Sequence, residues 1–153
     1  MNTRTTFSLI GAGIILILLF GCAAAPDNPP KQTVISLFGA MEKDDQAALV
    51  HLLDLPELMK NLNEDYAIQT DNPRVFTSPE QVLEDLTGEG LTKRTWFSLQ
   101  RIISRVHIEG EDAASVDVTF VDKEKSQGYM TRFGLHKVNG KWKIYSFKTI
   151  SGR

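Results

Sequence analysis

The sequence predicts an α+β domain in which N-terminal helices pack on a strongly bent four-stranded antiparallel sheet. Apolar residues recur at helical spacing in the first half of the chain, and they alternate with polar residues in the second half. Short polar turns separate the alternating segments, which is typical of an antiparallel meander with one face packed on helices. The length of 153 residues allows one such domain and leaves no room for a second sizeable core.

The first half of the chain contains the expected helices. The first starts near Pro30, and Asp44-Asp45 can cap the second with their carboxylates. The third follows Pro56 and extends to about Asp65. Ser78-Pro79 places a capping residue before a proline, which predicts the start of a fourth helix that ends at two glycines. One face of the first helix carries the apolar residues Val34, Leu37, Phe38 and Met41.

The second half, from Thr92 onward, has the pattern of strands. Trp96 to Ile108 is a long strand candidate, and its apolar residues change phase, which predicts a bulge or bend near Gln100. A second strand alternates strictly from Ala114 to Phe120. A third strand presents Tyr129, Thr131, Phe133 and Leu135 on one face.

Two shorter signals complete the elements. Asn139-Gly140 predicts a type I′ hairpin, after which Trp142 and Ile144 return on the far side. In the helical half, Arg74-Val75-Phe76 could form a very short strand.

The order of these elements resembles the NTF2-like superfamily, which has a cone-shaped α+β fold. The resemblance covers residues 31–153, and it is most specific in the closing hairpin, where residues 135–144 read LHKVNGKWKI. In that superfamily the sheet wraps around a helix and leaves an open cavity. Its members include isomerases, dehydratases and non-catalytic binding or assembly modules, so the resemblance implies a fold and leaves the function open.

If this chain has such a cavity, its wall is expected to be apolar. The inward positions of the predicted strands are apolar, which indicates core packing first and a cavity wall second. The residues expected to form the wall are Phe38, Phe120, Phe133, Leu135 and Trp142.

Signals for catalysis are weak, and no cofactor or metal is expected. His51, His107 and His136 lack the spacing of metal ligands; His107 should face away from its apolar neighbours, and His136 should face solvent. The superfamily's enzymes use Asp, Tyr or His inside the cone. By residue type the candidates for that role are Asp65, Tyr66, Tyr129 and Tyr145.

The N-terminus is typical of a bacterial lipoprotein signal. Residues 1–21 combine a positive start at Arg4 with a short apolar run. Leu19-Phe20-Gly21-Cys22 resembles a lipobox, in which the cysteine carries a diacylglyceryl group after cleavage before it. The alternatives are an uncleaved signal anchor, or cleavage near Ala25 with Cys22 unmodified.

Residues 22–30 then form the lipidated cysteine and a flexible tether. The tether contains Pro26, Pro29 and Pro30, and its last eight residues span at most about 29 Å when extended. The expected location is therefore the cell envelope, close to the bilayer surface. By analogy with lipoproteins, Ala23 directs export to the outer membrane, periplasmic side, in a host that has one.

The charge of the chain argues against nucleic-acid binding, and it is distributed unevenly between the two halves. With 17 Lys+Arg against 19 Asp+Glu, the chain lacks the basic excess of a nucleic-acid binder. The two halves differ, since residues 92–153 hold 12 basic and 6 acidic side chains. Clustered on one surface, the cations would favour anionic headgroups or an acidic partner, and the alternative is an ordinary solvated sheet face. The cations in question are Lys93, Arg94, Lys137, Lys141, Lys143 and Lys148.

The expected function is a membrane-anchored, non-catalytic module of the cell envelope that binds a small apolar ligand or a partner protein. One alternative is an isomerase or hydro-lyase that uses cavity Asp and Tyr groups. Another is a structural module that forms a homodimer through its sheet.

Overall fold

The computed structural model describes residues 28–69 and 75–150, except for the side chains of 65–69. Helices precede a four-stranded antiparallel sheet in this part of the chain, which confirms the predicted fold class. The helices are α1 (Pro29–Glu42), α2 (Gln46–Leu52), α3 (Leu55–Gln69), α4 (Pro79–Leu86) and α5 (Leu91–Phe97). The strands are β1 (Gln100–Ile108), β2 (Ala113–Asp122), β3 (Gln127–Val138) and β4 (Lys141–Ile150).

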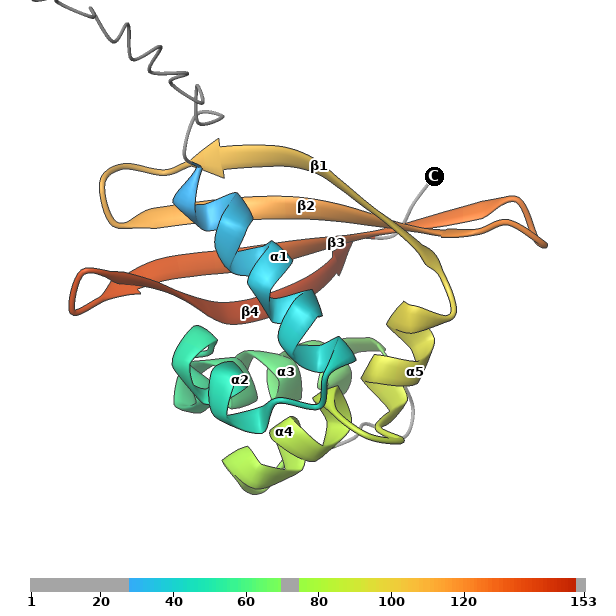
Figure 1. Ribbon diagram of the computed structural model, residues 1–153, viewed down its shortest axis with the longest axis horizontal. Helices are drawn as coiled ribbons and strands as arrows, with labels where there is room; N and C mark the ends of the chain where they lie inside the picture. The colour runs from blue at the N-terminus through green and yellow to red at the C-terminus, as the bar shows by residue number, and fades with distance from the viewer. Residues whose placement is uncertain (1–27, 70–74, 151–153) are drawn as a thin grey trace, which may run out of the picture.

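The helices cover one face of an open, twisted sheet (Figure 1). Helix α1 crosses this face, and α2, α3 and α4 gather below β4, with α5 under the end where β1 begins. Asn28 caps α1 through its side chain, and Asp45 caps α2 as predicted. None of the described helices is long and apolar enough to cross a membrane.

The sheet is a simple meander in the order β1-β2-β3-β4. The β3–β4 turn has positive φ at both Asn139 (51°) and Gly140 (75°), which confirms the type I′ hairpin. The α2–α3 connection lies against β4, because Leu53 forms a bridge with Ile144 and Asp54 donates its N–H to the carbonyl oxygen of Ile144.

A cluster of aromatic rings fills the space between α1, α5 and the sheet. Trp96 lies at its centre, with ring centroids 5.2–5.9 Å from those of Phe38, Phe120, Phe133 and Phe147. Two helices and three strands therefore meet in this cluster, which is part of a larger apolar core that also contains Val34, Leu37, Met41, Leu58, Val116, Val118, Leu135 and Ile144.

The predicted strand Trp96–Ile108 is wrong in its first part. Residues 91–97 form α5, and β1 begins only at Gln100. Thr95, Trp96 and Phe97 favour strands in general, but such preferences are weak compared with burial. From the helix, the Trp96 side chain reaches the centre of the aromatic cluster. The contacts of its ring with the four phenylalanine rings favour the helix over a strand at this position.

The irregularity in β1 lies further along than predicted. The register against β2 shifts between Ile103 and Arg105, not near Gln100. Because the shift separates Ile102 from Val106, these two residues lie on opposite faces: Ile102 is 46% exposed, and Val106 packs against the core. His107 lies on the face opposite Val106, as predicted.

Val75 and Phe76 form no strand, contrary to the prediction. The backbone N–H and carbonyl of Phe76 are instead bonded to the side-chain amide of Asn63, at 2.8 and 2.9 Å. One asparagine of α3 thus satisfies the groups that a neighbouring strand would have paired. Arg74 lies outside the described residues.

Candidate functional site

A pocket of about 370 Å³ opens between α5 and the end of the sheet where the β2–β3 turn lies. Ligand sites of proteins occupy about 300–1,000 Å³, so this pocket is of the size of a small-molecule site. It is lined by Thr95, Trp96, Ser98, Leu99, Phe120, Asp122, Lys125, Tyr129, Thr131 and Thr149.

The inner wall of the pocket is aromatic. The indole of Trp96 stacks on the ring of Phe120, with centroids 5.3 Å apart and planes 22° apart. Phe38 and Phe133 contact this pair on the core side, where both are buried. The rings that face the pocket are therefore held in place by rings behind them.

The five residues expected to form a cavity wall thus occupy different places. Phe120 lines the pocket although it is only 1% exposed, while Phe38, Phe133 and Leu135 lie in the core away from it. Trp142 is half-buried at the start of β4, with the Lys137 ammonium 5.2 Å from its ring centroid.

Threonine hydroxyls are among the polar groups of the pocket. Thr131 and Thr149 are cross-strand partners on β3 and β4 and both line it. Thr131 and Thr149 were not predicted as site residues, although Thr131 lies two residues before Phe133 and therefore shares its inward face. Trp96 was not predicted either, because it was assigned to a strand.

An internal ion pair stands at the mouth of the pocket. The Asp122 carboxylate accepts the backbone N–H groups of Glu124 and Lys125 at 3.0 and 3.1 Å, and the Lys125 ammonium lies 3.3 Å away. The N–H group and ammonium of Lys125 lower the pKa of Asp122. The carboxylate is therefore ionised at neutral pH and already satisfied by its own turn.

The two candidate acid–base residues with described side chains, Tyr129 and Tyr145, do not converge. Tyr129 lines the pocket and donates its hydroxyl to Gln127 at 2.8 Å, whereas Tyr145 stacks on the His136 ring at 4.8 Å. The side chains of Asp65 and Tyr66 lie outside the described part, and the helix that carries them continues to Gln69.

The three histidines also have different surroundings and share no partner. His51 is exposed beside the α1–α2 groove, and His107 lies 3.1 Å from Asp117. His136 was expected to face solvent but is half-buried, 2.8 Å from Asp54, because the α2–α3 connection lies against β4. Within residues 28–69 and 75–150, no three His, Cys, Asp or Glu side chains come together as metal ligands.

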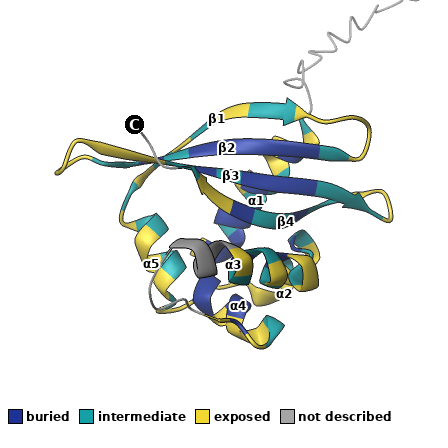
Figure 2. Cartoon of the chain, turned by 180° about the vertical axis from the view of Figure 1, so that it is seen from behind, coloured by how far each residue is buried: buried dark blue, intermediate teal, exposed yellow. Residues whose placement is uncertain are grey.

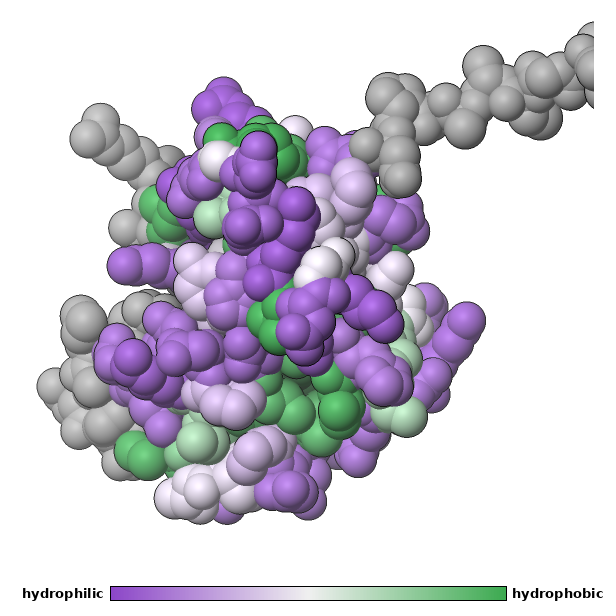
Figure 3. Space-filling model, turned by 90° about the vertical axis from the view of Figure 1, so that its left-hand side faces the viewer, coloured by the Kyte–Doolittle hydropathy of each residue, from purple (hydrophilic) through white to green (hydrophobic). Residues whose placement is uncertain are grey.

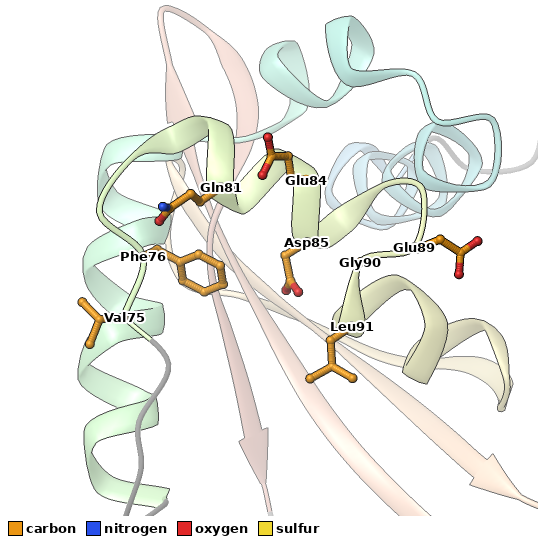
Figure 4. Close-up of a pocket in the computed structure, with 8 residues that line it drawn as sticks. All are labelled: Val75, Phe76, Gln81, Glu84, Asp85, Glu89, Gly90 and Leu91. Atoms are coloured by element: carbon orange, nitrogen blue, oxygen red, sulfur yellow. The ribbon is translucent and has the colours of Figure 1, made fainter.

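A second pocket lies between α4, the start of α5 and the segment before α4 (Figure 4). It contains three acidic residues, but their carboxylates diverge: Glu84 and Glu89 point away from each other and from Asp85. Asp85 is buried and accepts the hydroxyl of Thr92 at 2.5 Å. This arrangement does not present a convergent set of carboxylates to a ligand.

On the other face of the sheet, a buried carboxylate lies beside two half-exposed side chains, Arg132 and His107. Asp117 is 2% exposed, although none of the described helices covers this face, and β2 and β3 are largely buried (Figure 2). The Arg132 guanidinium bonds both of its carboxylate oxygens, at 2.7 and 3.0 Å. Arg132 and His107 thereby cover the carboxylate, and the bonds from Arg132 lower its pKa.

The six cations considered from the sequence do not form one patch. Lys93 and Arg94 lie on α5, where Lys93 pairs with Asp44, and Lys143 bonds the carbonyls of Val50 and Leu53. Lys137 and Lys141 lie at the β3–β4 hairpin. The end of the molecule that carries this hairpin is mostly hydrophilic, with apolar side chains gathered over the helices below it (Figure 3). Lys148 lies on β4 opposite Arg132, away from both groups.

Comparison with known proteins supports the fold. No family model and no curated protein matches the chain. An NTF2-like protein of unknown function from Shewanella baltica is similar in structure, with a TM-score of 0.50 and 16% identity over 82% of this chain and 92% of that chain. A candidate dehydratase of the NTF2-like family from Streptomyces avermitilis also has a TM-score of 0.50, at 15% identity over 81% and 94% of the two chains. At this identity the similarity shows the NTF2-like fold alone.

Proposed function

We propose that the domain binds a small, mainly apolar ligand, without catalysis, in the pocket between α5 and the sheet. The observation that carries this proposal is the aromatic wall of the pocket, where the half-buried indole of Trp96 stacks on the buried ring of Phe120 and contacts Phe133 behind it. A ligand site is typically an apolar concave surface with a few polar groups that fix orientation. The threonines of β3 and β4 supply such groups here.

Binding is favoured over proton transfer by the state of the titratable groups in the pocket. A general base works best with a pKa near the working pH, whereas the pKa of Asp122 is lowered by its turn. The hydroxyl of Tyr129 is engaged with Gln127. Both groups therefore already have hydrogen-bond partners within the domain.

The pocket is tested by filling it. N-phenyl-1-naphthylamine, an uncharged fluorescent probe, is expected to bind the soluble domain, and Thr149→Trp should weaken that binding at least about tenfold, because the added indole occupies the mouth. Lys148→Trp is the matched control, since the neighbouring Lys148 faces the other side of the sheet opposite Arg132. Equal binding by both variants would place the probe elsewhere and contradict the proposal.

We further propose that the chain is a lipoprotein of the cell envelope, anchored through Cys22. The support is the sequence alone: an apolar run ends at the one cysteine of the chain, and the domain begins a few residues later at α1. The proline-containing tether would then hold the pocket near the bilayer, where small apolar molecules partition.

The anchor is tested by intact mass of the protein purified from membranes. The expected mass corresponds to residues 22–153 with acyl chains, and Cys22→Ala should remove both the acylation and the cleavage before residue 22. An unmodified chain, or cleavage at another position, would contradict the anchor and leave the pocket proposal unaffected.

A further inference from the structure

Resting on the proposed function, the geometry points to the class of ligand: an uncharged molecule with a flat ring and one hydroxyl or carbonyl oxygen, which Thr131 recognises by a hydrogen bond. Three features of the pocket favour this class: the accessible hydroxyl of Thr131, the charge balance of the mouth and the aromatic wall.

The hydroxyl of Thr131 is available to a ligand. Thr131 is 4% exposed, yet its side chain makes no hydrogen bond within the described residues. No fully buried side-chain oxygen or nitrogen in the same residues lacks a partner. The Thr131 hydroxyl must therefore keep some accessible surface. Since the residue lines the pocket and is otherwise enclosed, that surface faces the pocket.

Such a hydroxyl favours a ligand that carries a polar atom at one point. Thr131 lies between Tyr129 and Phe133 on the inner face of β3, beside the aromatic wall rather than at the open mouth. A ligand without a polar atom would cover this hydroxyl and leave it without a partner, which costs free energy. Thr131 is thus a specificity-determining residue for the proposed ligand.

The charge balance disfavours an ionic ligand. The titratable groups at the mouth, Asp122 and Lys125, form an ion pair with each other. No cation or anion lining the pocket is left over to neutralise a charged ligand. Moving an unpaired charge from water onto the aromatic wall would be costly.

The aromatic side chains of the wall favour a ligand with a flat aromatic ring. The indole of Trp96 stacks on the ring of Phe120 and touches Phe147 edge-on at 5.2 Å, so its orientation is fixed from two sides. A half-buried indole held in this way can pair with a further aromatic ring by offset stacking or by an edge-to-face contact.

The test compares naphthalene, 2-naphthol and 2-naphthoate by equilibrium dialysis with the folded domain at neutral pH. These probes share one ring system and differ in the polar group. Wild-type protein is expected to bind 2-naphthol about fivefold or more tightly than naphthalene, and 2-naphthoate more weakly than 2-naphthol.

Thr131→Val keeps the shape of the side chain and removes the hydroxyl. It is expected to abolish the preference for 2-naphthol while naphthalene still binds. Thr119→Val, on the outer face of β2, should leave the preference unchanged. Equal affinity of wild-type protein for naphthalene and 2-naphthol, or an unchanged preference in Thr131→Val, would overturn the assignment of Thr131. Tightest binding of 2-naphthoate would overturn the uncharged class. If no probe binds the folded domain, the proposed function itself fails.

Discussion

Replacing Phe133 by alanine is expected to lower the free energy of unfolding by about 3–5 kcal/mol, the usual range for removing a buried aromatic side chain. Phe133 has no exposed surface, and its ring contacts those of Phe38, Trp96 and Phe147 at 5.2–5.8 Å. The cavity left behind would border α1, α5 and β4 at once, so no single element can move to close it. Urea unfolding followed by circular dichroism gives the free-energy change.

A matched control tests whether burial is the cause. Ile102→Ala removes an apolar side chain from β1 that is 46% exposed on the outer face, and it should cost less than about 1 kcal/mol. Phe133→Ala also tests the pocket, because the Phe133 ring contacts Trp96 on the core side. Phe133→Ala is expected to weaken N-phenyl-1-naphthylamine binding while the protein remains folded. Similar destabilisation by both variants would show that the aromatic cluster is not the centre of the core.

The fold class could be predicted because each half of the chain repeats one period over many residues. The alternation in 114–120 leaves one choice of face for β2, and the Asn139-Gly140 pair permits both positive φ angles that the hairpin needs. Such local signals do not depend on distant contacts, and they were sufficient for β2 and for the β3–β4 hairpin, but not for the start of β1.

The site could be predicted only in part, because distant segments build it. The side chain of Trp96 favours a strand by type, yet it belongs to α5 and meets four rings from α1, β2, β3 and β4. Its indole lies among the rings that were expected to form the wall of a cavity. The pocket that the structure shows lies beside this indole and is lined by Thr131 and Thr149. No period in the sequence contains that information.

Asp117 illustrates the same limit on the other face of the sheet. Alternation predicts that it points away from the core, and it does, but alternation cannot predict that it is buried. Its cover comes from Arg132 on β3 and His107 on β1, and the register of two strand pairs brings them to it. A polar residue on an outward position can therefore be as enclosed as a core residue.

This enclosure makes Asp117 the polar residue on which stability is expected to depend most. Asp117→Asn keeps the size of the side chain but removes the charge that Arg132 binds. We expect a loss of about 2 kcal/mol at neutral pH, less than for a fully buried pair, because the Arg132 and His107 side chains are each 41% exposed and can be hydrated. Asp112→Asn is the control: its side chain is 79% exposed and its ion pair with Lys137, at 3.4 Å, is worth about 0.5 kcal/mol or less.

The pH dependence distinguishes loss of this charge from loss of shape. The hydrogen bonds from Arg132 hold the pKa of Asp117 in the folded protein below its unfolded value of about 3.9. The unfolded chain therefore binds the proton more readily, so the stabilisation is fully present above that unfolded value and is lost as the pH falls through the folded one. Unfolding free energies measured from neutral pH to about pH 3 should fall more steeply for the wild type and Asp112→Asn than for Asp117→Asn. Apart from residues 112 and 117, the acidic groups are the same in all three proteins. If the three curves of unfolding free energy against pH were parallel, the folded structure would not favour the ionised form of Asp117. Arg132 would then cover this carboxylate without stabilising its charge.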